Sequence, residues 1–310
     1  MVDATGYLQT RDNLAIRYAC MPSGSPKPRG TVVLLGGRAE FIEKHEETIK
    51  ELNDRALQVY TFDWRGQGLS SRLLEDRQKG HVESFDQYMG DLQRFLDRIL
   101  FPNAEAPIIF LAHSMGGHIT LRYLNETPSA TAGAVLVSPM IDICTHPLPH
   151  GLTRWLSKIA GRAGWSEHYI VGAGDYNPER QPFKNNPLTN DPHRFMDEHK
   201  KINSNPALAL GGVTYGWLSA AFESIDTIFS SNNWKNMETP VLMVGGSADR
   251  VVSIPAMRRM CQRLADCRCV VLKHAKHEIL KETDSVRRQF WLEFDQFFEK
   301  ITQIKSGGLT

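Results

Sequence analysis

The chain has 310 residues, of which 41% are hydrophobic and 23% are charged, so it is long enough to bury a sizeable globular core. A formal net charge of +1 and the absence of a long basic run argue against a nucleic-acid partner. No apolar run approaches the roughly 20 residues of a membrane-spanning helix, and the first residues lack the basic-then-apolar order of a secretory signal.

The five cysteines are an odd number, so they cannot all pair with one another within the chain. They are Cys20, Cys144, Cys261, Cys267 and Cys269. Because no Cys-x-x-Cys pair and no Cys/His ligand spacing occurs, the sequence predicts neither a metal site nor a cofactor. Reduced thiols in a cytoplasmic protein are the simplest interpretation, with peripheral contact to the inner face of the membrane left open.

The first half of the chain alternates strand and helix signals. Two β-friendly segments between Gly6 and Met21 predict a hairpin. Short continuous apolar runs predict strands buried on both faces at Thr31–Leu35, Val59–Phe62, Ile108–Leu111 and Ala134–Val137. Helical patterns follow these runs at Phe41–Leu52, Phe85–Leu100 and Met115–Asn125.

The alternation stops between Met140 and Trp234, where two apolar stripes at helical spacing cover Leu152–Ile159 and Val213–Phe229. We therefore predict a helical cap over residues 140–235, inserted into a core formed by residues 1–139 and 236–310. Two further strands and a closing helix complete the core, at Val241–Val244, Cys269–Leu272 and Thr283–Ile301. The expected fold is α/β, with a mostly parallel sheet covered by helices on both faces.

The stretch IIFLAHSMGGHITLRYL, residues 108–124, places Ser114 between small residues where a predicted strand turns into a predicted helix. Two interpretations compete. The serine caps the helix, or it occupies a nucleophile elbow that holds its hydroxyl out for attack on a carbonyl. The choice depends on whether the chain also supplies a base, an acid and an oxyanion site.

Ligands in open α/β sheets bind at the carboxyl ends of the strands, so residues just after predicted strands are the candidates. Asp249 follows Val241–Val244, and His277 follows Cys269–Leu272. The chain order Ser114, Asp249, His277 is that of α/β-hydrolase triads. We predict Ser114 as the nucleophile, His277 as its general base, and Asp249 as the carboxylate that orients the imidazole.

Each triad candidate also has a purely structural interpretation. A helix that starts near Ser253 would give Asp249 a capping role. His277 would then be an ordinary loop histidine, and His274 is its nearest rival as the base. Their joint order and placement favour catalysis.

Attack on an ester produces an oxyanion, which needs two preset N–H donors. The backbone N–H of Met115 is one predicted donor, because it follows the nucleophile at a helix N-terminus. The backbone N–H of Arg38, in the stretch Gly36–Glu40 after the strand Thr31–Leu35, is the other. An ordinary glycine turn into a helix is the alternative for that stretch.

Five segments carry a family resemblance: LLGGRAEF, FDWRGQGLSSR, AHSMGGHI, GGSADRVVS and KHEILKE. In these segments the chain resembles the α/β-hydrolase group that contains bacterial lysophospholipase L2 and the monoacylglycerol lipases. In the family's His-Gly-x-x-Glu-His loop, Gly36 and Phe41 replace the two histidines, whereas Gly37 and Glu40 match. Ala112 replaces the first glycine of the Gly-x-Ser-x-Gly elbow, a change of one methyl group that the turn should tolerate.

The resemblance implies an α/β-hydrolase fold and a cofactor-free serine hydrolase that cleaves lysophospholipid or monoacylglycerol acyl esters. The expected partner is then a small-molecule ester or a single-chain lipid. Aromatic residues of the cap are predicted to line the acyl pocket, namely Trp155, Trp217 and Phe222.

Contact with a membrane is a further expectation for the cap. Arg154, Lys158 and Arg162 alternate with the Leu152–Ile159 stripe, as on a helix that lies at an anionic membrane surface. Packing of the stripe against the core, with the basic residues facing water, is the alternative.

Two other functions remain open. The same triad would serve the hydrolysis of small esters, lactones or peptides with a free N-terminus. A non-catalytic relative that binds a ligand ranks last, because such relatives often lack a triad residue and this chain lacks none.

Overall fold

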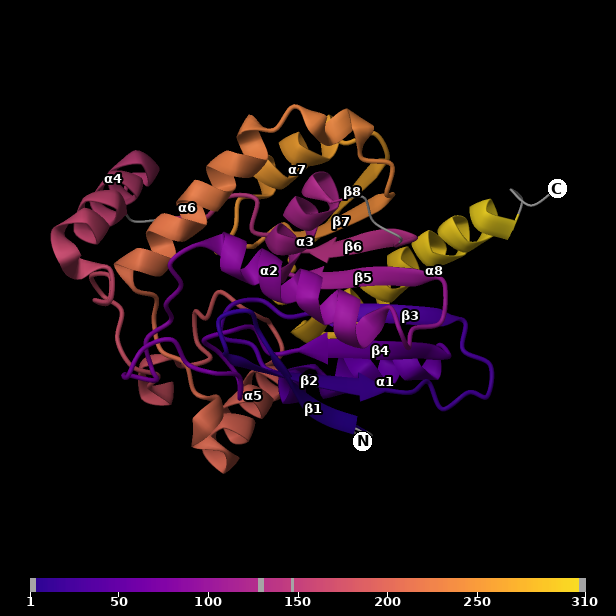
Figure 1. Ribbon diagram of the computed structural model, residues 1–310, viewed down its shortest axis with the longest axis horizontal. Helices are drawn as coiled ribbons and strands as arrows, with labels where there is room; N and C mark the ends of the chain where they lie inside the picture. Colours follow the sequence, from indigo (N-terminus) through magenta and orange to yellow (C-terminus); the bar gives the residue numbers. More distant parts are fainter. Residues whose placement is uncertain (1–3, 128–130, 146–147, 307–310) are drawn as a thin grey trace.

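The computed structural model describes residues 4–127, 131–145 and 148–306, which fold around one eight-stranded sheet (Figure 1). The strand order is β1-β2-β4-β3-β5-β6-β7-β8. The bounds are β1 Ala4–Gln9, β2 Ala15–Met21, β3 Gly30–Leu35, β4 Leu57–Phe62, β5 Ile108–His113, β6 Gly133–Val137, β7 Val241–Gly246 and β8 Cys267–Leu272. Neighbouring strands from β4 to β8 are parallel, whereas the β1–β2 hairpin pairs antiparallel at one edge. The predicted α/β fold is confirmed.

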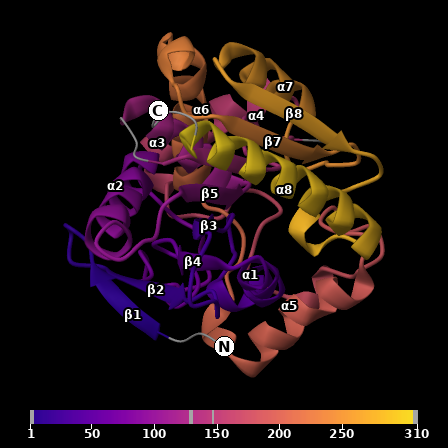
Figure 2. The same ribbon diagram turned by 90° about the vertical axis from the view of Figure 1, so that its right-hand side faces the viewer.

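Helices cover both faces of this sheet (Figures 1 and 2). The α-helices are α1 Glu46–Asp54, α2 Phe85–Phe95, α3 Met115–Glu126, α4 His150–Ala160, α5 Pro192–Ser204, α6 Tyr215–Ser230, α7 Ile254–Arg263 and α8 Asp284–Ser306. The short 3-10 and π-helical segments are η1 Ile42–His45, η2 Leu96–Leu100, η3 Gly161–Trp165, η4 Pro178–Arg180, η5 Pro206–Leu208, η6 Asn233–Asn236 and η7 Ile279–Lys281. Polar N-caps start several of them; the Ser253 hydroxyl, for example, accepts the Ala256 N–H at 3.2 Å to open α7.

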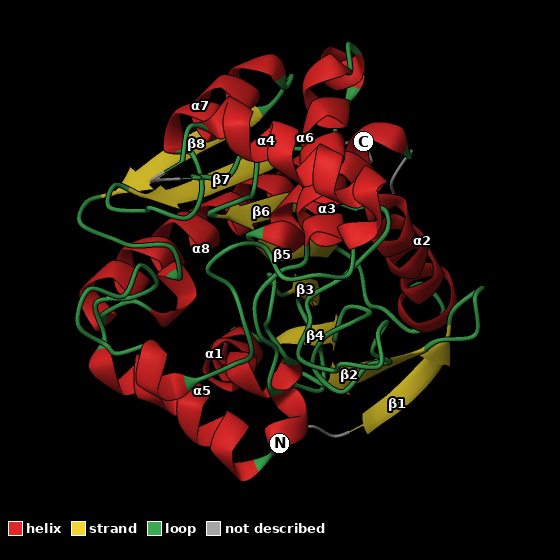
Figure 3. Cartoon of the chain, turned by 90° about the vertical axis from the view of Figure 1, so that its left-hand side faces the viewer, coloured by secondary structure: helices red, strands yellow, loops and turns green. Residues whose placement is uncertain are grey.

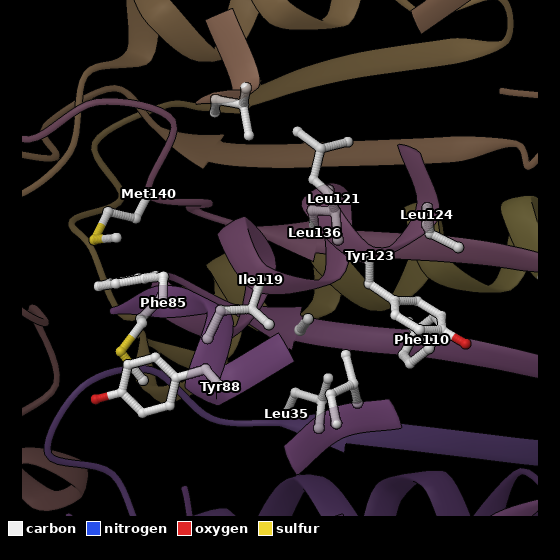
Figure 4. Packing of buried hydrophobic residues seen from close by; sticks show 14 of the residues in the cluster. Leu35, Phe85, Tyr88, Phe110, Ile119, Leu121, Tyr123, Leu124, Leu136 and Met140 are labelled. Carbon is white, nitrogen blue, oxygen red and sulfur yellow. The ribbon is translucent and has the colours of Figure 1, made fainter. Parts of the chain in front are cut away.

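Alternate residues along the parallel strands point to opposite faces of the sheet, and each set joins its own apolar core. On one face Leu35, Phe110 and Leu136 pack under α2 and α3, as Figure 4 shows from close by. On the other face Leu34, Leu111 and their neighbours pack under α1 and α8. Burial on both sides explains why these strands read as continuous apolar runs in the sequence.

The segment between β6 and β7 contains α4, α5 and α6, as the break in the sequence pattern predicts. Helix α6 lies against α2 and α4, and α4 projects beyond α6, away from the sheet (Figure 1). Helix α5 lies instead beside α1 (Figures 2 and 3), where Arg194 pairs with Glu47 at 2.6 Å and Lys201 with Glu46 at 2.9 Å. We call residues 140–235 the insertion; its role as a separate cap stays a prediction.

The structure joins Cys261, near the end of α7, to Cys267, at the start of β8, in a disulfide. The expectation of reduced thiols is therefore wrong for this pair. The short turn between α7 and β8 brings the two Cα atoms to 5.4 Å, a contact that no ligand-type cysteine spacing indicates. The other three cysteines, Cys20, Cys144 and Cys269, are free.

The first turn of α3 lies directly against the end of β3, and this contact brings two functional loops together. A Cβ atom on Gly116 would lie 2.5 Å from the carbonyl oxygen of Gly36 and 2.7 Å from that of Leu35. Both oxygens belong to the backbone, so neither can rotate away as the end of a side chain can. Only glycine fits at this position without displacing β3 or α3.

Gly116→Ala is therefore expected to lower the free energy of unfolding by about 1–3 kcal/mol, because the added methyl group overpacks a rigid contact. Urea denaturation measures the change. Gly90→Ala is the matched control, because Gly90 is an exposed residue of α2 with nothing near its missing Cβ. That control should stabilise the protein by about 0.5–1 kcal/mol through helix propensity. Equal stability of the two variants would contradict the proposed contact.

Candidate active site

Ser114 occupies the turn between β5 and α3 with φ of 50° and ψ of −114°, a strained backbone conformation for a non-glycine residue. Its N–H donates to the carbonyl of Val137 at 3.0 Å, and its own carbonyl accepts N–H groups from His118 and Met140. The Ser114 hydroxyl makes no capping hydrogen bond to α3. The capping interpretation of this serine is therefore wrong.

The structure brings Ser114, His277 and Asp249 together at the carboxyl ends of β5, β7 and β8. The Nε2 atom of His277 lies 3.0 Å from Ser114 Oγ, and its Nδ1 atom lies 2.8 Å from Asp249 Oδ2. His274, the rival histidine, is exposed on the same loop and has no such contact. The three side chains thus form one hydrogen-bonded series from hydroxyl to carboxylate.

Asp249 is held as an acceptor from two directions. Its Oδ1 atom accepts the backbone N–H groups of Val251 at 2.8 Å and Val252 at 3.1 Å, while Oδ2 faces His277. Burial raises the pKa of this carboxyl, but the hydrogen bond and charge of His277 and the two N–H groups outweigh it, so the pKa is lowered. Asp249 is consequently ionised at neutral pH. The cap of α7 is Ser253, so Asp249 does not serve as the N-cap of that helix.

The two expected oxyanion donors lie on either side of Ser114. Met115 follows it at the start of α3, and Arg38 follows Gly37, whose missing Cβ would lie 3.0 Å from Ser114 Cβ. Neither the Arg38 nor the Met115 N–H donates to an acceptor among the described residues. The Gly37 N–H is not free, because it donates to the Glu40 carboxylate.

Two residues that the sequence did not single out hold the loop after β3 in place. Trp64 Nε1–H donates to the carbonyl of Gly36 at 2.8 Å. The Gln67 amide donates to the Gly37 carbonyl at 3.0 Å and accepts the Ala39 N–H at 2.9 Å. Both residues belong to the FDWRGQGLSSR segment, which is one of the five that carry the family resemblance. These bonds set the backbone direction on both sides of Arg38.

A cavity of about 410 Å³ opens beside Ser114 and His277. Its walls come from the loop after β3, from η1, from the insertion and from the loop after β8. Charged and polar side chains dominate the lining: Arg38, Glu40, Lys44, His113, Asp175, Tyr176, Arg180, Glu198 and Glu278. The substrate part nearest the triad is therefore expected to carry polar or charged groups.

A buried ion cluster forms one side of this cavity, around Lys44. The Lys44 ammonium lies 2.7 Å from Glu278, 2.8 Å from Glu198 and 3.3 Å from Glu40. Burial lowers the pKa of Lys44, but the three carboxylates raise it further, so its net pKa is well above the usual value. Lys44 is thus a fixed cation whose charge is already compensated.

His113, the residue before Ser114, also joins this cluster. Its Nδ1 atom lies 3.1 Å from Glu40 Oε1, and its Nε2 atom lies 3.3 Å from the carbonyl oxygen of His277. Burial lowers the pKa of His113, but the charge of Glu40 raises it by more, so the net pKa is above the usual value. Because both ring nitrogens face acceptors, the imidazole fits best as a protonated donor that steadies the backbone of His277. The spacing of the elbow motif alone does not indicate this contact.

The three aromatic residues predicted to line the acyl pocket do not line this cavity. Trp217 and Phe222 belong to α6 and are buried in the core cluster. The ring centroids of Trp217 and Phe85 lie 5.7 Å apart there. Trp155 lies on α4 and is 59% exposed. That prediction is wrong for the cavity at Ser114. The helical spacing identified apolar stripes, but it could not tell which stripe faces the core, the cavity or the solvent.

Known proteins resemble the chain over most of its length. Residues 26–284 match the family described as serine aminopeptidase, S33. The probable lysophospholipase L2 of Haemophilus influenzae is 29% identical over 294 residues, which cover 94% of this chain and 91% of that protein. Lysophospholipase L2 of Escherichia coli strain K12 is 30% identical over 264 residues, 83% of this chain and 76% of that one.

Solved structures show the same fold. A soluble variant of monoglyceride lipase from Saccharomyces cerevisiae, bound to a substrate analogue, has a TM-score of 0.76 at 19% sequence identity. The match covers 97% of this chain and 98% of that one. The matched range, residues 26–284, spans the positions of Ser114, Asp249 and His277. The chain therefore belongs to the serine aminopeptidase S33 family of α/β-hydrolases.

Proposed function

We propose that this protein is a serine hydrolase that cleaves the acyl ester of single-chain lipids, lysophospholipids or monoacylglycerols, through an acyl-enzyme on Ser114. The observation that carries the proposal is the hydrogen-bonded series Ser114, His277, Asp249 at the wall of a cavity. No cofactor takes part in the proposed reaction. The relatives named lysophospholipase L2 support the lipid substrate.

In the proposed mechanism, His277 takes the proton of Ser114 as the hydroxyl oxygen attacks the ester carbonyl. The oxyanion that develops accepts the N–H groups of Arg38 and Met115. His277 then returns the proton to the departing alcohol, and a water molecule activated by the same imidazole releases the fatty acid. Ionised Asp249 keeps Nδ1 protonated and stabilises the imidazolium that forms in both half-reactions.

Charge in the cavity favours esters over peptides with a free N-terminus. An N-terminal ammonium needs a carboxylate that is not already paired. The cavity carboxylates of Glu40, Glu198 and Glu278 all contact Lys44, so each already has a cationic partner. The complete triad likewise argues against a non-catalytic ligand-binding protein.

We propose that the insertion acts as a cap that meets the lipid surface through α4. Four apolar residues of α4 point outward, with exposed fractions of 42% for Leu152, 59% for Trp155, 39% for Leu156 and 42% for Ile159. The face of α4 that packs inward presents Ser157 and Ala160. An apolar stripe turned toward solvent is the arrangement of helices that lie in a membrane interface.

Basic residues add to this surface only in part. Lys158 is exposed beside the stripe, whereas Arg154 turns toward α6, where it pairs with Asp226 and lies over the Phe222 ring. The side chain of Arg162 lies outside the described residues. Within the part of the chain that is described, no helix has the length and hydropathy that crossing a bilayer requires. The cytoplasmic location with contact to the inner membrane face stays a prediction.

Ser114→Ala is expected to lower the hydrolysis of p-nitrophenyl laurate at least about 10⁴-fold, because it removes the nucleophile. A fluorophosphonate probe should label the wild type at Ser114 and leave the variant unlabelled. Ser285→Ala, on the exposed start of α8, serves as the matched control and should keep full activity. Unchanged hydrolysis by Ser114→Ala, with a circular dichroism spectrum like that of the wild type, would contradict the assignment.

The double variant Leu152→Ser/Trp155→Ser is expected to bind vesicles of phosphatidylcholine and phosphatidylglycerol at least about tenfold more weakly than the wild type, because two apolar side chains no longer enter the bilayer. Co-sedimentation measures the bound fraction. Leu292→Ser is the control, since Leu292 is 62% exposed on α8, away from the insertion. Equal loss of binding in both variants would mean that α4 is not the contact.

A further inference from the structure

Arg38 places its backbone beside Ser114 and its side chain in the catalytic cavity. The guanidinium Nη1 donates to the carbonyl of Gly211, in the insertion, at 3.0 Å. This bond holds the side chain across the cavity wall, close to Gly80. Within residues 4–127, 131–145 and 148–306, no carboxylate lies within ion-pair distance of the guanidinium.

Three arginines that are more deeply buried than Arg38 are compensated by carboxylates. Arg17, Arg65 and Arg287 each contact two carboxylates at the ends of their guanidinium groups. Arg72 lacks a carboxylate contact in the described chain, but it donates to three backbone carbonyls instead of one. Within the described residues the Arg38 guanidinium therefore makes one hydrogen bond and no carboxylate contact, at the wall of the cavity beside Ser114.

The cavity carboxylates make their direct contacts with other groups, although the nearby Glu198 charge does act to raise the pKa of Arg38. Glu40, Glu198 and Glu278 are in contact with Lys44. Asp175 accepts the hydroxyl of Tyr169 at 2.7 Å. Burial lowers the pKa of the Arg38 guanidinium, yet a guanidinium remains protonated at neutral pH. A half-buried cation without a direct carboxylate contact is stabilised by an anion that enters with the ligand.

We infer that the Arg38 guanidinium binds the phosphate of a lysophospholipid headgroup while the acyl ester of the same molecule lies at Ser114. The inference rests on the proposed function and narrows its substrate class to phosphate-bearing esters. A guanidinium binds phosphate oxygens through two parallel N–H groups, which gives both energy and orientation.

The reach of the side chain fits this substrate. In a 1-acyl lysophospholipid, the covalent path from the ester carbonyl carbon to phosphorus has as many bonds as the path from an arginine's backbone nitrogen to its guanidinium carbon. One residue can thus offer its N–H to the oxyanion and its guanidinium to the phosphate. A monoacylglycerol has the same ester but no phosphate, so it offers the guanidinium no anion to bind. Arg38 is then the residue that separates the two substrate classes.

The test compares kcat/KM for 1-palmitoyl lysophosphatidylcholine and 1-palmitoylglycerol in mixed micelles. The ratio of the two values should fall on the order of tenfold to a hundredfold in Arg38→Met, and less in Arg38→Lys, because charge-assisted hydrogen bonds are lost. Effects on the backbone N–H act on both esters and cancel in the ratio. Arg288→Met, which removes the same charge from an exposed position on α8, should leave the ratio unchanged.

A second measurement uses the wild type alone. Glycerophosphocholine should inhibit 1-palmitoylglycerol hydrolysis competitively, and glycerol should not. If only inorganic phosphate inhibits, or if the ratio is the same in Arg38→Met as in Arg288→Met, the headgroup assignment is overturned while the hydrolase itself stands. Hydrolysis of neither ester by the wild type would overturn both the assignment and the proposed function.

Discussion

The close backbone contact between the end of β3 and the start of α3 is the constraint on which the site depends. Because Gly116 has no side chain, α3 begins against the carbonyl groups of Leu35 and Gly36. The contact places the elbow serine beside the loop that carries Arg38. The positive φ of Ser114 then directs its hydroxyl toward His277. Ser114, His277 and the backbone N–H groups of Arg38 and Met115 thus meet through backbone packing, which side-chain motion disturbs little.

Electrostatics divides the surroundings of the triad into two parts. On one side, ionised Asp249 is stabilised by two backbone N–H groups and faces the imidazole of His277. On the other side, Lys44, three carboxylates and His113 form a closed cluster in which each carboxylate contacts the Lys44 ammonium and Glu40 also contacts His113. Such a cluster is stable in a buried position because every member has a partner. Arg38 lies at the edge of this arrangement, where its guanidinium donates to the carbonyl of Gly211 and makes no direct carboxylate contact within the described residues.

Different parts of the insertion form different kinds of surface. Helix α5 is tied to α1 by ion pairs, and the residues around Gly211 hold the side chain of Arg38. Helix α4 contacts the rest of the protein mainly through α6, and its apolar stripe, Leu152–Ile159, faces the solvent. One end of the insertion therefore completes the polar cavity, and the other offers an apolar surface. A lipid with a charged headgroup and an apolar chain matches this division.

The sequence by itself determined the order and type of nearly all elements of the sheet, because strands buried on both faces must be continuous apolar runs. It also predicted that Ser114, Asp249 and His277 lie together, as the structure has them, because residues that follow parallel strands converge on one edge of the sheet. The direction of the stripes on α4 and α6, the enclosure of Trp217 and Phe222, the Cys261–Cys267 disulfide and the ion cluster at Lys44 were decided only by tertiary structure. The spacing of apolar residues predicts that a helix has an apolar face. What that face packs against depends on contacts between residues far apart in the chain. Partners of the charged Lys44, His113 and Arg38 side chains also lie in segments far away in the chain. Sequence patterns therefore could not predict which of these charges would be paired.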